Sequence, residues 1–360
     1  MRSFAVWYNK KDKSKDDEVK ADIHVNFWSQ LNYETNPELC FFDFGIKIED
    51  LSNVDFINIY CPFQSKPEDI KDLGGKISNN CLIDAIFNED YSVTEGIAKY
   101  YIVQRADCKD ENNDKVTDKF IVYSLNGTSE IIIKTCNREK VKPDDPRDKK
   151  VSLGTIISLK VGALLDNATG LAKGIKSYYF RIRVVTTKQS LRLINKKIEN
   201  INIFKEYLES IELMDLRIND IRSCCDEVRN QFNIGSVFFV KSIHLLVMRK
   251  VNEEVSAEGN TYDCRLLEKD IWNKYIDKLD DNFIAYHFKR KQRARLDDDI
   301  NNRIRVISYP VENMVILLKL KYKKIIYSTV LKYCLYAVGL AAFSNLVYDV
   351  FRFLFNRFFG

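Results

Sequence analysis

The chain has little glycine, proline or histidine, and its cysteines do not form a CxxC pair: the 360 residues include 13 Gly, 6 Pro and 3 His. So little Gly and Pro excludes a collagen-like chain, and 46% hydrophobic residues exclude a disordered one. Nine cysteines cannot pair completely, and a chain of this length can bury a core without crosslinks. We therefore expect reduced thiols in an ordinary globular protein.

Catalytic and cofactor motifs are also missing. Asp43-Phe44-Gly45 matches the magnesium triplet of kinases, but no glycine-rich loop or catalytic loop accompanies it. Gly74-Gly75-Lys76 lacks the spacing and the following Ser or Thr of a phosphate-binding loop. His24, His244 and His287 lie in three separate segments, none with a His or Cys at metal-ligand spacing. The sequence predicts no catalytic residue, no metal site and no cofactor, and it leaves open whether the protein is an enzyme.

The sixteen residues of Tyr333–Tyr348 carry no charge, and the run reaches twenty-four residues with only Lys332 charged when it is extended back to Ile325. As a helix these lengths span about 24 Å and about 36 Å, which bracket the ~30 Å hydrocarbon core of a bilayer. We therefore predict one transmembrane helix. Its membrane-spanning residues include Ile325, Leu331, Tyr333, Leu335, Val338, Gly339, Leu340, Ala342, Phe343, Leu346, Val347 and Tyr348.

The flanks of this run predict its orientation. Tyr322 and Tyr327 precede it and Phe351 and Phe355 follow it, as in the aromatic belts of membrane helices. More Lys and Arg precede the run than follow it, which predicts a tail anchor with the N-terminal body in the cytoplasm. The lysines that precede it are Lys319, Lys321, Lys323 and Lys324.

Two other placements of the same run are open. Ser344 and Asn345 interrupt it, so it could be the buried helix of a soluble domain. It could also lie flat in the membrane interface, although its apolar residues surround the helix rather than forming one stripe. The small residues Gly339 and Ala342 permit close approach of a second helix, so we expect membrane lipid and a second copy of the chain as partners.

The rest of the chain is predicted to be an α+β body. We expect a flexible segment over residues 1–21, followed at 22–187 by a β-rich, sandwich-like domain, because β-branched and aromatic residues alternate there between turn residues. Helices are expected at 67–73 and 80–87. The strands expected in this domain are 22–28, 40–48, 56–63, 99–104, 119–125, 130–134, 152–162 and 178–186.

Residues 188–232 change pattern. Apolar side chains from Ile194 to Phe232 recur at a mean spacing near 3.5 residues, which is typical of a supercoiled helix. The pattern predicts one long amphipathic helix or a helical hairpin. Its stripe serves either as a coiled-coil seam between copies or as a face packed on its own domain.

Residues 233–311 are expected to form a small α+β unit with a helix at 265–279, followed at 312–360 by the basic juxtamembrane segment and the membrane helix. Residues 289–324 hold eleven Lys and Arg against four acidic residues, a surplus larger than the net charge of +5, so the remaining body is acidic. We weigh three roles for the basic stretch: contact with anionic lipid, contact with nucleic-acid phosphate, or a solvated surface. Its residues are Lys289, Arg290, Lys291, Arg293 and Arg295.

These features lead to one functional hypothesis and two alternatives. We expect a bacterial, tail-anchored membrane protein whose cytoplasmic module binds an unknown ligand or protein partner, and the architecture suits a sensor or a membrane effector, for instance in phage defence. The N-terminus supports a cytoplasmic body because the apolar run Phe4–Tyr8 is too short for a secretory signal. The alternatives are a soluble or peripheral protein that binds or acts on nucleic acid, and a structural oligomer.

Overall fold

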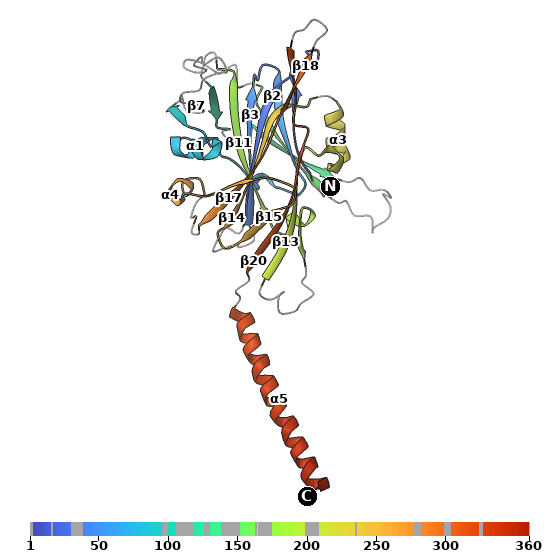
Figure 1. Ribbon diagram of the computed structural model, residues 1–360. Coiled ribbons are helices and arrows are strands. Elements are labelled where there is room, and N and C mark those ends of the chain that lie inside the picture. The colour runs from blue at the N-terminus through green and yellow to red at the C-terminus, as the bar shows by residue number, and fades with distance from the viewer. Residues whose placement is uncertain are drawn as a thin grey trace.

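The fold is known from a computed structural model of the whole chain. The residues that the structure describes are 3–15, 17–29, 39–95, 100–105, 118–125, 130–137, 152–162, 164, 175–198, 209–234, 236–276, 279, 282–298, 304–323 and 327–359. Two large β-sheets form a body, and one long helix extends from it (Figure 1).

The first sheet has eight strands, mostly antiparallel, with β1 and β13 as a parallel pair at its centre. A short strand, β12 (Asn195–Ile198), pairs with β13 outside the main order. The main order is β15 (Glu254–Ala257), β20 (Met314–Lys323), β13 (Glu209–Ile218), β1 (Ser3–Lys10), β4 (Val54–Cys61), β10 (Ser152–Lys160) and β9 (Ile131–Asn137).

The second sheet has ten strands, and two of its neighbouring pairs, β14 with β2 and β11 with β8, are parallel. Strand β5 (Ile70–Asp72) pairs with β11 outside the main order. The main order is β16 (Asp263–Leu266), β17 (Phe283–Lys291), β14 (Phe239–Lys250), β2 (Lys20–Trp28), β3 (Leu39–Glu49), β11 (Ser177–Thr187), β8 (Lys119–Tyr123), β7 (Tyr100–Arg105) and β6 (Tyr91–Glu95). A separate ribbon pairs β18 (Arg293–Asp298) with β19 (Ile304–Tyr309).

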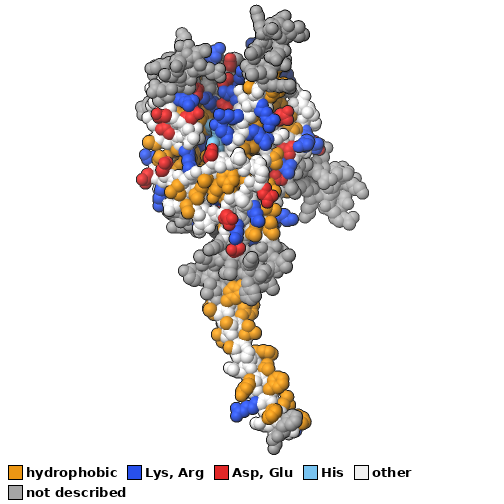
Figure 2. Space-filling model, in the orientation of Figure 1, with side chains coloured by type: hydrophobic (Ala, Val, Ile, Leu, Met, Phe, Trp, Pro, Cys, Tyr) orange, Lys and Arg blue, Asp and Glu red, His pale blue; other side chains and the backbone are white. Residues whose placement is uncertain are grey.

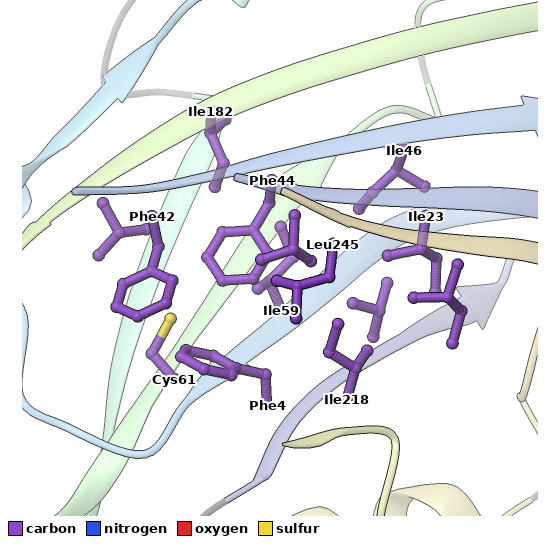
Figure 3. Packing of buried hydrophobic residues seen from close by; sticks show 14 of the residues in the cluster. Phe4, Ile23, Phe42, Phe44, Ile46, Ile59, Cys61, Ile182, Ile218 and Leu245 are labelled. Atoms are coloured by element: carbon purple, nitrogen blue, oxygen red, sulfur yellow. The ribbon is translucent and has the colours of Figure 1, made fainter. Parts of the chain in front are cut away.

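The two sheets pack face to face around the main core. Alternate residues of each strand point inward, so Phe4 and Ile59 of the first sheet meet Phe42 and Leu245 of the second (Figure 3). The rings of Phe4 and Phe42 have centroids 4.8 Å apart. This packing confirms the expected α+β fold with a sandwich-like β-rich body.

Short helices cover the outer faces, on opposite flanks of the body (Figure 1). Helix α3 (Asp226–Asn233) packs on the first sheet through Val228 and Phe232. Helices α1 (Asn80–Phe87) and α4 (Lys269–Trp272) pack on the second. The described residues also form four single 3-10 turns: η1 (Pro67–Asp69), η2 (Gly74–Lys76), η5 (Ser190–Leu193) and η6 (Ile221–Ser223).

The expected long helix over 188–232 is wrong. Its described residues form η5, β12, β13, η6 and α3, and residues 199–208 lie outside the described part. In β13 the buried side chains include Met214, Leu216 and Ile218, two residues apart, while Ile211 on the other face is half-buried. A strand with apolar residues on both faces also has apolar residues three and four positions apart, as a helix does. Backbone pairing with β1 and β20 therefore decides that residues 209–218 form a strand.

Three smaller expectations also change. Within the segment expected to be flexible, residues 3–8 form the buried part of β1. The helix expected at 67–73 is η1 followed by β5. Among the described residues of the helix expected at 265–279, α4 is the helical part, and residues 265–266 belong to β16.

Strands cross the expected domain boundaries. β1 and β4 pair with each other and β1 also pairs with β13, while β2 pairs with β14. The eight strands expected between residues 22 and 187 are each present with ends shifted by a few residues, and α1 coincides with the expected helix at 80–87. In the basic segment expected beside the membrane, residues 314–323 form strand β20.

Candidate functional site

Helix α5 (Tyr327–Phe359) is the first functional element, and it stands away from the body (Figure 1). Its stretch Leu331–Phe358 has 28 residues, none of the apolar window within it is buried, and it is long and apolar enough to cross a membrane. At 1.5 Å per residue it spans about 42 Å, more than the ~30 Å hydrocarbon core. Figure 2 shows apolar side chains along the length of this helix and Lys or Arg only near its far end.

The predicted membrane residues lie on this helix, except Ile325, which is outside the described residues. The side chains of Val338, Leu340 and Phe343 are 68%, 67% and 63% exposed. The alternative of a helix buried in its own soluble domain is therefore wrong for the described part of α5. Burial by another molecule or by lipid is what such a surface requires.

The second element is the outer face of the ten-stranded sheet, which has an apolar half and a polar half. The apolar half carries Trp28 and Phe41, which are covered by α1 and by the segment around α4. The polar half is exposed at β17, where Lys289 and Lys291 lie, and buried at β3 and β11, where Asp43 and Arg181 lie. Three successive rows of paired residues run across strands β17, β14, β2, β3 and β11: Lys291, Ser242, Asp22, Lys47 and Tyr179; then Lys289, His244, His24, Gly45 and Arg181; then His287, Leu246, Asn26, Asp43 and Arg183.

These rows bring together all three histidines of the chain. The rings of His24 and His244 have centroids 4.8 Å apart, and those of His244 and His287 are stacked at 5.1 Å. Their strands are distant in sequence, so neither spacing nor motif indicated the cluster. The only sequence signal is an alternation of polar residues on otherwise apolar strands, such as His287, Lys289 and Lys291.

A hydrogen-bonded chain links the histidines to a carboxylate. Ser242 Oγ donates to Asp22 Oδ1 at 2.6 Å, so its oxygen accepts from His244 Nε2 at 3.1 Å. His244 Nδ1 then accepts from His287 Nε2 at 3.1 Å. Because the serine proton points to the carboxylate and not to an imidazole, the arrangement differs from that of an activated serine nucleophile.

All three imidazoles are held neutral at physiological pH. Burial, followed by the neighbouring His244 and Arg181, lowers the pKa of His24 well below its usual value. Burial and then Lys289 lower the pKa of His244 to about 3. Burial and then Lys289 also lower the pKa of His287. Burial, together with the neighbouring cationic side chains, therefore keeps the three imidazoles from taking up a proton.

A buried network of hydrogen bonds lies beside the histidines on the same face of the sheet. Asp43 accepts two bonds from Arg183, at 2.7 and 2.9 Å, and one from Tyr275 Oη at 2.8 Å. Arg181 donates to Tyr275 Oη and to Tyr179 Oη, both at 2.6 Å. Gly45 leaves the space for these groups, since a Cβ there would lie 2.0 Å from Tyr179 Oη. Tyr179 brings this network next to His24, since the centroids of their rings are 5.8 Å apart.

The polar half encloses a cleft of about 350 Å³, named here the histidine cleft. Figure 2 shows a histidine surface among Lys and Arg side chains on the upper part of the body. The residues that line the cleft are Asp22, His24, Lys47, Phe87, Glu89, Tyr91, Asp118, Lys241, Ser242, His244, Lys289, Lys291 and Gln292.

The four lysines that line the cleft differ in whether they form an ion pair with a carboxylate. Lys47 contacts Asp118 at 2.9 Å, and Lys241 contacts Asp22 at 3.4 Å as well as Glu49. Lys289 and Lys291 form no ion pair with a described carboxylate. Burial, followed by the neighbouring Lys291, lowers the pKa of Lys289.

The other predicted basic residues are spread over the molecule. Arg290 and Arg293 line a second hollow, of about 470 Å³, together with Lys291 and Tyr309. On β20, Lys319 is exposed and Lys321 contacts Glu209 at 3.4 Å. The side chains of Arg295 and Lys323 and the whole of Lys324 lie outside the described residues. The basic stretch therefore divides between the histidine cleft and the strand that leads to α5.

No family model matches the chain, and no curated protein matches it. Across the described residues, no group of three or more His, Cys, Asp or Glu side chains could hold a metal ion. The candidate functional features of the described residues are therefore α5 and the histidine cleft.

Proposed function

We propose that this protein is a single-pass, tail-anchored membrane protein whose cytoplasmic body binds a ligand. The observation that carries the anchor is the exposed apolar surface of α5, with Leu331, Leu335 and Leu346 all more than 60% exposed. Burying one such side chain is worth about 1.5–3 kcal/mol. Summed over the helix, the cost of leaving it in water exceeds the stability of an ordinary domain, so a bilayer is its favoured solvent.

The orientation follows from charge. Lys319 and Lys321 lie on β20, only a few residues before α5 begins, and further lysines follow at 323 and 324. Arg352 and Arg357 lie at the far end with Asp349. The excess of positive charge before the helix favours a cytoplasmic body.

The body is suited to ligand binding. β17 ends beside β18, at the end of the body remote from α5 (Figure 1). Lys289 and Lys291 of the histidine cleft lie near this end of β17, away from α5, which favours a soluble ligand over the lipid contact considered for them. A ligand-bound body joined to a membrane helix suits a sensor or an effector, and a role in phage defence is a hypothesis from architecture alone.

Self-association is proposed through the membrane helix. The coiled-coil seam considered for residues 188–232 has no long helix to carry it. Gly339 has open space around it, and Ala342 lies one turn further along, so a second α5 could approach closely there.

Membrane fractionation tests the anchor. The full chain should stay in the membrane pellet after high-salt and alkaline washes and leave it only in detergent, and deletion of residues 325–360 should release it. Val338→Arg/Leu340→Arg should weaken insertion, because each central Arg costs about 2.5–3.5 kcal/mol, whereas Val338→Ile/Leu340→Ile should not. Full-length protein in the soluble fraction without detergent would refute the proposal.

Nucleic-acid binding is the second candidate, favoured by the hollow that Arg290 and Arg293 line beside Tyr309. It predicts salt-dependent binding of single-stranded RNA or DNA that Arg290→Gln/Arg293→Gln abolishes. Absence of such binding by the wild-type protein at low salt would exclude it.

A further inference from the structure

Two adjacent ammonium groups at the rim of the histidine cleft form no ion pair among the described residues, although the Glu89 and Asp22 carboxylates of the cleft act on Lys289 from a longer distance. Lys289 and Lys291 lie two residues apart on the same face of β17, and neither contacts a described carboxylate. The other lysines of the cleft, Lys47 and Lys241, are already paired with acidic side chains. Two like charges brought together repel each other, and an anion between them relieves the repulsion.

A buried polar atom points to a ligand in the same cleft. His24 is only 6% exposed, lines the cleft, and its Nδ1 has no hydrogen-bond partner among the described residues. An unpartnered buried polar atom costs about 1–3 kcal/mol, so native proteins rarely keep one without a partner. The ring of Phe87 packs edge-on against His24 at 5.2 Å and forms an apolar wall.

We propose that the histidine cleft binds a small phosphorylated molecule, with the phosphoryl group between Lys289 and Lys291 and its inner side against His24. A phosphate monoester carries nearly two negative charges at neutral pH, which matches two ammonium groups better than a carboxylate does. Such a group accepts hydrogen bonds, so it satisfies a neutral His24 whose Nδ1 carries the proton. The volume of about 350 Å³ admits a ligand of metabolite size.

This inference rests on the proposed role of the body as a ligand-binding module, and it is independent of the anchor. Lys289 and Lys291 lie near the end of β17 that leads to β18, remote from α5 (Figure 1), so a soluble phosphate compound reaches them more readily than a lipid headgroup does. Binding and membrane fractionation therefore test different claims.

Calorimetric titration of the full chain in detergent micelles tests the site. The probes are inorganic phosphate, AMP and adenosine. We expect AMP or phosphate to bind and adenosine to bind at least about tenfold more weakly than AMP, because it lacks the charged group. Tighter binding of AMP than of phosphate would place an aromatic moiety against Phe87, whereas equal binding would assign the site to the phosphoryl group alone.

Variants locate the site. Lys289→Gln/Lys291→Gln should weaken binding at least about tenfold, and Lys289→Arg/Lys291→Arg should retain it. The control Lys196→Gln/Lys197→Gln makes the same change of charge on β12, at exposed lysines away from the cleft, and should bind normally. The proposal is overturned if neither AMP nor phosphate binds, or if the Gln variant of the cleft binds as the wild type does.

Discussion

Removal of the Asp43 carboxylate should destabilise the body strongly. Asp43 is fully buried and accepts four hydrogen bonds: two from Arg183, one from Tyr275, and one from Trp28 Nε1 at 3.1 Å. In Asp43→Ala the guanidinium of Arg183, itself 6% exposed, keeps its charge without a partner. Breaking a buried pair in this way costs about 3–5 kcal/mol, a large part of the stability of a typical domain.

Urea unfolding of the full chain in detergent, followed by tryptophan fluorescence, measures this loss. Trp7, Trp28 and Trp272 are all buried in the body, and α5 contains no tryptophan, so the signal reports the body alone. A matched control is Asp226→Ala, since Asp226 is 81% exposed and contacts the exposed Arg229. That surface pair should contribute less than about 1 kcal/mol.

The double variant Asp43→Ala/Arg183→Met separates an unpaired charge from other effects. It removes both charges and should recover part of the stability lost in Asp43→Ala, because a buried pair can often be replaced by apolar groups at little cost. A loss in Asp43→Ala no larger than in the Asp226→Ala control would refute the reasoning. So would a double variant less stable than Asp43→Ala.

Two further predictions concern the titration of His244 and the close approach of Tyr179 to Gly45. His244 is neutral in the folded state, with a pKa of about 3, but binds a proton near pH 6.5 when unfolded, so acid favours unfolding. Its contribution to the unfolding free energy should fall by about 2 kcal/mol between pH 8 and pH 5, and His244→Gln should remove that part of the slope in urea titrations. Gly45→Ala should cost about 1–3 kcal/mol, because the added methyl meets Tyr179 Oη; an unchanged urea midpoint would contradict the close approach described there.

Much of the local structure could be predicted because it depends on neighbouring residues. Alternation of apolar and polar side chains indicated β2, β3 and β11, where inward-facing residues form the core. Helix α1 was also predictable, since the Asn79 side chain caps its start and Asn88, at φ 58°, ends it in the left-handed conformation. The pattern at 188–232 misled because its apolar residues satisfied two periods at once, and only pairing with β1 and β20 distinguished them.

The amino-acid sequence alone determined that a long apolar helix ends this chain and that strands dominate the rest, since both depend on the composition and periodicity of contiguous residues. The tertiary structure alone decided which polar residues meet. His24 precedes His244 by 220 residues, and His244 precedes His287 by 43 residues. Strand register in one sheet brings the three histidines together with Lys289. Register is a property of paired strands, so no single segment of sequence contained the histidine cleft.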